Sequence, residues 1–525
     1  MNKTAELWVR LSWLAMAGAI SVQGADEVQK LAPMVITATR STQTASEVPL
    51  TLTRIGGDQI ARAVAVDEAL AEAPAFGLFR RTSSVIANPP ARGVSLRGIG
   101  PSGASRSLVL LDGVPLNDPF GGWVAWSAVP RISLGEAQIV PGGGSSVWGS
   151  AALSGVIALQ RTPLEMRRIE AGVELGAFET VRGEVSATVP TGKGFVRVDA
   201  ETFSTEGFFS LKPADRGAVD RTLESEHHAV QTTWRQPVSE TVEATTTVRY
   251  FEEERGNGTV LQKNASEAGF ASLALAGRPR DGLTWEAVGY GQRQEFSSTF
   301  TAVSANRQSE TLTTDQFAVP AEAAGGAASM TWQTDAARTT VGGDVRWVEG
   351  ETQEDFLMQA GQFTRRRFAG GEQFFAGVFA HHSRAFGERW RASLDVRLDH
   401  WENNDGRLRE VDRATGLAVT DNVFADRRGG EFSPRAGLVW QPTKQWRVRT
   451  AAYQAFRVPT LNEYYRPFRV GTANTLANAA LEVETLTGAE LGGEFSAGPV
   501  RLEATGFVNE LRDAVGNVTL SSTPT

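Results

Sequence analysis

The feature that most constrains this chain is an alternation of apolar and polar residues that begins near residue 168 and recurs many times. In 389–400, the even positions from Trp390 to Leu398 are apolar and the odd positions from Arg389 to Asp399 are polar or charged. Because successive side chains of a strand point to opposite faces, each run predicts a strand with one apolar and one polar face. About fifteen such runs occur, at 168–176, 180–189, 195–205, 227–236, 240–251, 267–276, 283–296, 312–325, 338–350, 371–385, 389–400, 430–441, 445–456, 485–496 and 499–510.

The connections between these predicted strands alternate between short and long after the first one. The short ones, such as 190–194 and 278–282, are tight turns that contain Pro and Gly. This sorting is typical of outer-membrane barrels, and a soluble sandwich or propeller has no reason to show it. The sequence therefore predicts a mostly β protein with a transmembrane antiparallel β-barrel. The long, polar connections lie at 206–226, 252–266, 297–311, 351–370, 402–429 and 457–484.

The N-terminal segment has the composition of an export signal. Residues 11–22 are apolar, Lys3 and Arg10 precede them, and small residues follow near Gly24. This apolar run is too short to cross a bilayer as a helix, which needs about 20 residues. We therefore expect a signal peptide over 1–24, rather than a buried helix, and a mature protein in the outer membrane of a Gram-negative-type bacterium.

Composition argues against several functions. The chain has no cysteine, which removes disulfides, thiolate metal sites and cysteine nucleophiles, and its net charge of −8 disfavours nucleic acid as a partner. The adjacent pairs His227–His228 and His381–His382 are expected to point to opposite faces of their strands, so we predict no metal site. No catalytic motif occurs in a suitable context. We expect neither an enzyme nor a cofactor.

Residues 33–163 have a different texture, with a helical stretch predicted near 58–73, short strands and many glycines. Three segments follow in order: VSLRGIG at 94–100, LVLLDGVPL at 108–116 and GGGSSVWGSAALSGVI at 142–157. In this order, and ahead of a predicted barrel, they resemble the plug domain of TonB-dependent outer-membrane receptors.

Further segments extend this resemblance along the chain. RVPTLNEY at 457–464, with LEVE at 481–484 and ELG at 490–492, resembles a motif of the late barrel in that family. PMVITATR at 33–40 is similar to the family's TonB box. Its residues Met34, Val35, Ile36, Thr37, Ala38 and Thr39 are β-prone and could add as a strand to a partner's sheet edge, although an ordinary first strand of the plug is the alternative.

The resemblance implies a domain order. We expect the signal peptide at 1–24, an extension with the TonB box at 25–45, an α+β plug inside the lumen at 46–163, and an incomplete barrel at 164–525. In the family, plug arginines face barrel glutamates, and the matching positions are Arg97, Glu484 and Glu490. Pro141 stands where many relatives carry Arg, so one ionic contact is expected to be absent. A solvated lumen wall is the alternative interpretation of these charges.

The resemblance places the ligand between extracellular loops and two apical plug loops, at about 81–92 and 115–126. The second plug loop is rich in aromatic and amide side chains, an amphipathic surface suited to a bulky ring-bearing ligand. Arginines at 365–367 and 427–428, expected in two long loops, could attract an anionic iron chelate, although lipopolysaccharide contact or solvation is as good an account. The expected ligand contacts are Arg81, Asn88, Asn117, Asp118, Phe120, Trp123, Trp126, Arg365 and Arg366.

The function implied by the resemblance is transport. Such a receptor binds a scarce, bulky ligand outside and imports it to the periplasm with energy transmitted by TonB and its ExbB/ExbD complex. A ferric siderophore is the first expectation for the ligand and cobalamin the second, with lipid and lipopolysaccharide around a monomeric barrel. A passive porin-like or adhesive outer-membrane barrel is the alternative.

The parity of the connections predicts that the barrel is incomplete. If the first strand rises from the periplasm, the fifteenth also rises, and closing the ring there would pair two strands in parallel. Single-chain bacterial barrels close with antiparallel pairing and an even number of strands, and plugged transporters have about 22. We therefore expect a plug beside a curved, open sheet whose fifteenth strand is an unpaired edge.

Overall fold

The computed structural model describes residues 40, 43–79, 82–86, 88, 92–100, 103–470 and 473–521. The chain divides into two units, Met1–Met34 and Val35–Thr525, and all of these residues belong to the second. Within these ranges, no helix combines the length and the apolar character needed to cross a membrane. The predicted signal peptide and the TonB box, Met34–Thr39, lie outside the described residues.

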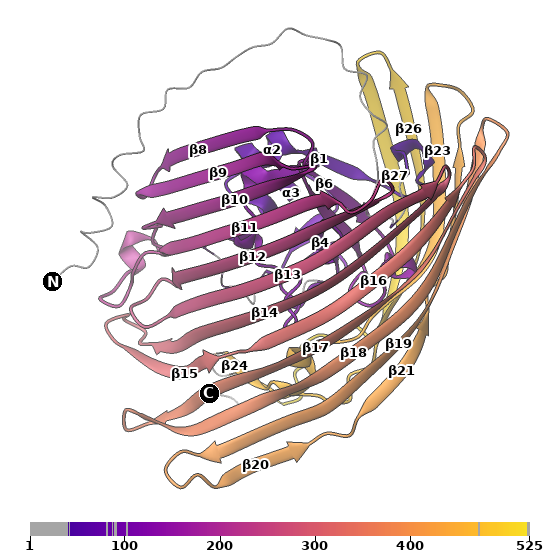
Figure 1. The fold of residues 1–525 in the computed structure, drawn as a ribbon. Coiled ribbons are helices and arrows are strands. Elements are labelled where there is room, and N and C mark those ends of the chain that lie inside the picture. The colour runs from indigo at the N-terminus through magenta and orange to yellow at the C-terminus, as the bar shows by residue number, and fades with distance from the viewer. Residues whose placement is uncertain are drawn as a thin grey trace. The chain divides into compact units, whose positions relative to one another are not determined.

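The N-terminal part of the described chain is a small α+β unit around a five-stranded sheet with the order β1-β6-β7-β4-β5. Strand β4 runs parallel to β7, and the other pairs are antiparallel. This unit is the plug (Figure 1). Its elements are η1 (Ala45–Glu47), β1 (Thr53–Gly56), α2 (Gly57–Arg62), α3 (Val66–Leu70), β2 (Phe76–Leu78), β3 (Val94–Leu96), β4 (Leu108–Leu111), β5 (Val114–Pro115), η3 (Trp126–Ala128), η4 (Arg131–Ser133), β6 (Leu134–Pro141), α4 (Ser145–Trp148) and β7 (Gly155–Arg161).

The single helical stretch predicted near 58–73 is two short helices instead. The chain is extended at Ala63 and Ala65, between α2 and α3, where the β-branched Val64 disfavours a continuous helix. The break lets Ile60 and Leu70 both enter one apolar core, in which Trp126 is only 1% exposed.

A large antiparallel sheet curves around the plug (Figure 1). Its described strands are β8 (Arg168–Gly176), β9 (Thr180–Thr191), β10 (Gly194–Thr205), β11 (Ser225–Pro237), β12 (Val242–Gly256), β13 (Lys263–Arg280), β14 (Leu283–Val303), β15 (Glu310–Ala318), β16 (Ala321–Gln333), β17 (Ala337–Gln359), β18 (Gln362–Phe386), β19 (Trp390–Asp412), β20 (Ala418–Val423), β21 (Arg427–Phe432), β22 (Arg435–Trp440), β23 (Trp446–Arg457), β26 (Glu484–Ala497) and β27 (Val500–Arg512). Smaller elements in its connections are η5 (Pro213–Asp215), α5 (Leu461–Tyr465), β24 (Phe468–Val470) and β25 (Ala473–Thr475).

The eighteen segments of the described sheet make fifteen passes. Strands β15 and β16 both lie between β14 and β17, so they are one pass interrupted at Val319–Pro320. Likewise, β20, β21 and β22 all pair with β19 and form one pass in three pieces. The fifteen runs of the sequence pattern therefore correspond to the fifteen passes.

The two ends of this series are β8 and β27. In the strand order, β27 is followed by β8, so the sheet forms a ring and the expectation of an open sheet is wrong in that respect. The residue-by-residue register, however, is continuous only from β8 through to β27. Among the described strands, no register pairs residues of β27 with residues of β8. Most residues of both strands are exposed on both faces.

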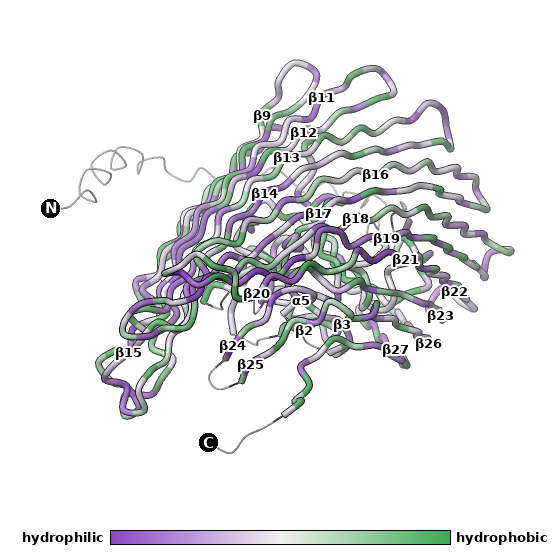
Figure 2. The backbone as a smooth tube through the Cα atoms, turned by 90° about the horizontal axis from the view of Figure 1, so that it is seen from below, coloured by the Kyte–Doolittle hydropathy of each residue, from purple (hydrophilic) through white to green (hydrophobic). Residues whose placement is uncertain are grey.

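Hydrophilic and hydrophobic residues alternate along the strands (Figure 2), and burial shows that they lie on opposite faces of the sheet. On β19, the side chain of Arg397 is 2% exposed on the plug side, whereas the next residue, Leu398, is 60% exposed on the outer side. The histidine pair of β11 divides in the same way, because His227 is buried and His228 is exposed. The inner face is therefore polar where it meets the plug, and the outer face is apolar.

Candidate functional site: the interface between plug and barrel

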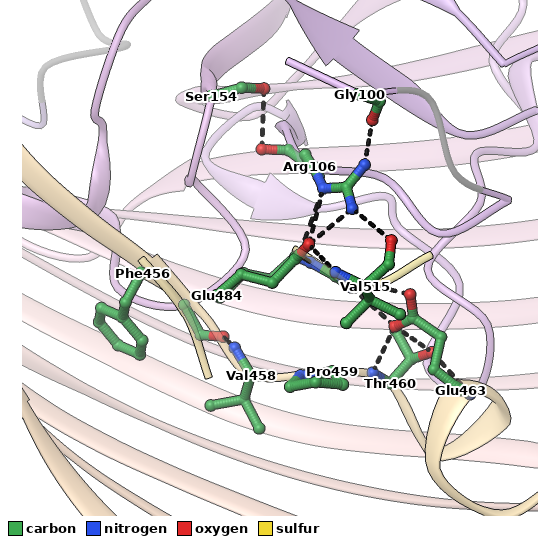
Figure 3. Close-up of polar contacts among 12 residues, drawn as sticks. Gly100, Arg106, Ser154, Phe456, Val458, Pro459, Thr460, Glu463, Glu484 and Val515 are labelled. Carbon is green, nitrogen blue, oxygen red and sulfur yellow. Dashed lines mark hydrogen bonds and ion pairs between the residues drawn. The ribbon is translucent and has the colours of Figure 1, made fainter. Parts of the chain in front are cut away.

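A buried charge network joins the plug to strand β26. The Arg106 guanidinium, just before β4, lies 2.6 Å from a carboxylate oxygen of Glu484 and also donates to the carbonyls of Gly100 and Val515 (Figure 3). Glu484 accepts a second guanidinium, that of Arg457 at the end of β23, and the backbone N–H of Val515 at 2.8 Å. One carboxylate thus holds a plug arginine and a wall arginine together.

The motif at 457–464 has a local physical basis. Thr460 caps helix α5 by accepting the N–H of Glu463, and the Glu463 carboxylate accepts the N–H of Thr460 at 2.8 Å. This reciprocal arrangement is a capping box. The same carboxylate accepts Arg457 at 2.8 Å, so the cap also positions the arginine that reaches Glu484.

The second contact joins Arg97 to Glu490 at 2.6 Å, with both side chains almost fully buried. Arg97 also donates to the hydroxyls of Thr51 and Tyr453. Arg97 and Gly98 both have positive φ, 56° and 65°, and this turn directs the arginine away from β3 toward the wall. Glycine adopts that conformation without steric cost, which accounts for the Arg-Gly pair in the sequence.

The family resemblance matches Arg97 with both glutamates, but in the structure Glu484 contacts Arg106 instead. Arg106 was missed because it stands two residues ahead of the recognised segment 108–116. The available signal was a charged residue two positions before the fully buried strand β4, where a charge needs a partner.

Arg40 and residues 43–51, which precede the plug sheet, lie along the inner wall. Arg40 contacts Asp344 on β17 at 2.5 Å, and the amide of Gln43 lies 3.0 Å from His381 on β18. The Glu47 carboxylate lies 3.2 Å from Arg338 on β17 and 2.9 Å from Arg391 on β19. The backbone N–H of Thr51 donates to Glu490 on β26, and the carbonyls of 45, 46 and 48 accept from Arg447 on β23.

The apical plug loop at 115–126 is not the exposed amphipathic surface that we expected. Phe120 and Trp123 are 1% and 4% exposed and belong to a cluster with residues of the wall. The Trp123 ring lies 5.8 Å from that of Phe296 on β14, and Phe120 lies against Gly350 on β17. These side chains therefore anchor the loop to the barrel.

Two other expected ligand residues of this loop stabilise the plug itself. Asn117 accepts the N–H of Val109 at 2.9 Å and donates to the Ser107 carbonyl, and Trp126 is in the plug core. In the first apical loop, Asn88 is half-buried and its carbonyl oxygen has no hydrogen-bond partner within the described part of the chain, while Arg81 lies outside the described residues.

Asp118 in the same loop is a buried carboxyl. It accepts the N–H of Gly121 at 2.5 Å and the side-chain amide of Gln294 on β14. Burial raises the pKa of Asp118 to about 7, because these hydrogen bonds and the nearby Arg346 offset only part of its desolvation. We therefore expect the contact between this loop and β14 to depend on pH near neutrality.

The arginines expected in long loops are in strands. Residues 365–367 are in β18, because β17 and β18 continue as a hydrogen-bonded ribbon through the predicted loop 351–370. Each of the three arginines contacts a carboxylate: Arg365 contacts Asp412, Arg366 lies 2.8 Å from Asp355, and Arg367 lies 2.6 Å from Glu354. Arg427 and Arg428 are likewise in β21. Local carboxylates thus partly neutralise the positive charge expected at 365–367.

Two connections on the long-loop side are tied together. Arg307, in the hairpin between β14 and β15, donates to both carboxylate oxygens of Asp220, at 2.9 Å from Nε and 2.5 Å from Nη2. The Gly217 N–H donates to the same carboxylate at 2.7 Å. The hydrogen bonds from Arg307 hold the pKa of Asp220 down, at about 2.

Family models match most of the chain. The model described as TonB dependent receptor-like, beta-barrel, matches residues 207–525, and the model described as TonB-dependent Receptor Plug Domain matches residues 44–156. Among curated proteins, the vitamin B12 transporter BtuB of Vibrio vulnificus is 28% identical over 204 residues, which cover 38% of this chain and 32% of that protein. That match therefore spans about a third of the relative's length.

Solved structures of low sequence identity share the fold. The ferric yersiniabactin uptake receptor FyuA from Yersinia pestis has a TM-score of 0.69 at 12% identity, over 89% of this chain and 73% of its own. The ferric-catecholate import receptor Fiu from E. coli, in its open form, has a TM-score of 0.69 at 14% identity, over 91% of this chain and 77% of its own.

Proposed function

This chain belongs to the TonB-dependent receptor family, and we propose that it binds a scarce, bulky ligand outside the outer membrane and imports it with energy from TonB. The observation that carries the proposal is the way the plug is held. Arg106–Glu484 and Arg97–Glu490 are buried ion pairs between plug and wall. Breaking a buried pair costs about 3–5 kcal/mol, so the plug is rarely released from the wall by thermal motion alone. An energised partner would supply the free energy for its release.

We infer further that TonB engages residues 34–39 by strand addition and that ExbB/ExbD energises it. Arg40 and residues 43–51 support this proposal, because they come just after the box in sequence and are fixed to the wall at several points. A pull on the box would reach these contacts before it reached the plug sheet. The barrel is proposed to act as a monomer among lipid and lipopolysaccharide.

For the ligand, we propose a ferric siderophore first and cobalamin second. The names of the two solved relatives refer to ferric yersiniabactin and ferric catecholate, and the name of the curated relative refers to vitamin B12. Because the solved relatives share the fold at low identity, their ligands are a starting panel rather than an assignment.

The test separates binding from import. We expect Val35→Pro to abolish uptake of radiolabelled ferric siderophores or cyanocobalamin by cells while leaving binding at the cell surface intact, since proline removes a hydrogen-bond donor from the added strand. Val35→Thr is the matched control, because it keeps a β-branched residue with its N–H and should transport normally. Uptake that survives Val35→Pro and dissipation of the proton gradient would favour the passive barrel instead.

A further inference from the structure

We propose that the inner wall carries a binding site for an anionic, oxygen-rich ligand on its way past the plug, formed by Arg249 on β12, Gln292 on β14 and Arg346 on β17. We call these three residues the donor strip. This inference rests on the proposed function for its biological meaning. It deepens that function by naming the ligand chemistry and the side of the plug along which the ligand passes.

Strand register places the donor strip on one face. Arg249 is directly opposite Phe270, and Phe270 is opposite Gln292. One row away, Tyr290 is opposite Gly325, and Gly325 is opposite Arg346. Outer-face neighbours confirm the side, because Val248 and Val345 are 54% and 50% exposed. Since side chains alternate between faces, the strip points toward the plug.

The strip consists of hydrogen-bond donors that lack acceptors. The Gln292 amide nitrogen and the Arg346 Nε are buried, and neither has a partner among the residues that the structure describes. In the same described ranges, the Arg249 guanidinium has a ring contact, 4.7 Å from the centre of Phe270, but no hydrogen bond. An unpaired buried donor is unfavourable, and an oxygen-rich ligand would supply the missing acceptors.

A cavity at one end of the strip separates the plug hairpin β4–β5 from the wall. Its empty volume is about 480 Å³, part of it open to solvent, and Leu116 and Asp112 of the plug line it together with Arg161 and Arg249. Arg161 already lies 2.5 Å from Asp112. Asp112 also attracts Arg249 through space, but in the described part of the chain no carboxylate is hydrogen-bonded to Arg249. The apolar lining residues are suited to the rings of a chelate.

The other end of the strip reaches the apical loop. Along β14, alternate residues Phe296, Gln294, Gln292 and Val288 share the inner face. Phe296 meets Trp123 and Gln294 meets Asp118, whereas Val288 lines the cavity. On β14, the unpaired amide of Gln292 thus lies between these plug contacts and the cavity beside the β4–β5 hairpin. Release of the apical loop would open this strip first.

The test is anion binding to the purified full chain, measured by equilibrium dialysis with radiolabelled citrate as the anionic probe and radiolabelled sucrose as the neutral one. We expect the wild type to bind citrate and Arg249→Gln and Arg346→Gln to bind it about tenfold more weakly, the size of one lost charge-assisted hydrogen bond. Arg293→Gln is the matched control, since Arg293 neighbours Gln292 on the outer face and is 73% exposed.

Heat-modifiable migration on gels would check that each variant is folded. If an arginine variant fails to fold, Gln292→Glu keeps the side-chain size and should weaken citrate binding by repulsion. Equal citrate affinity in the wild type and the strip variants, no citrate binding by the wild type, or equal binding of sucrose would overturn the proposal. The assay needs neither TonB nor transport, so its result is independent of the Val35→Pro experiment.

Discussion

The Arg106 guanidinium lies 2.6 Å from the Glu484 carboxylate, and these side chains are 3% and 0% exposed. The two residues are far apart in sequence, so this contact buries a plug residue together with a residue of a late wall strand. Among the described contacts of Arg106, Glu484 is the only carboxylate. Glu484 also accepts a hydrogen bond from Arg457, so its loss would remove a partner from two buried guanidinium groups.

Glu484→Gln should therefore loosen the plug. The substitution keeps the side-chain size but removes the charge that two arginines share, and we expect the free energy of plug release to fall by about 3–5 kcal/mol. Urea-induced release, followed by protease cleavage of the plug, would measure it. Glu510→Gln on β27 is the control, since Glu510 is 62% exposed beside Arg512 and should change stability by about 0.5 kcal/mol or less. An unchanged release curve for Glu484→Gln would show that the pair does not hold the plug.

Asp118→Asn should remove a pH dependence. The pKa of Asp118 is about 7 in the folded protein, above its usual value of 3.8, so the folded state retains a proton that the unfolded state releases. The free energy of unfolding should then fall as pH rises from about 4 to 7, by about 4 kcal/mol at most. Asparagine stays neutral, and the variant should lose this slope.

Urea-induced plug release at pH 4, 5.5 and 7 would test this expectation. Asp58→Asn is the control, because Asp58 is an exposed aspartate of the same plug and its replacement should leave the slope intact. A slope that persists in Asp118→Asn would mean that another group is responsible.

Asp220→Asn should free the connection between β10 and β11. The Arg307 guanidinium then loses its ionised partner, and we expect protease cleavage within 206–224 to become about tenfold faster. Asp220 has a lowered pKa of about 2, so the wild-type tether should be complete above pH 4 and be lost only as pH falls toward 2. Asp215→Asn, an exposed aspartate in the same connection, is the control. Equal cleavage of the two variants would contradict the tether.

The strand passes were predictable because alternation depends only on which face each residue occupies. The three-part pass β20–β22 and the long ribbon of β17 and β18 were not, since polar residues on both faces resemble a loop in sequence. The burial of Trp123 could not be predicted from the sequence either, because an aromatic residue in an apical loop can equally well contact a ligand or anchor the loop to the barrel. Only its contact with Phe296, on a distant strand, decides between them.

Four residues ahead of the plug sheet contact the wall one after another along the chain: Arg40, Gln43, Glu47 and Thr51. Their partners lie on β17, β18, β19 and β26. A pulling force applied ahead of Arg40 would therefore break these contacts one after another, beginning with that of Arg40. The peak force is set by the strongest single attachment, while the total work is the sum over all of them. A small force that acts over a long distance would therefore release such a chain, whereas all the contacts together resist a pull over a short distance.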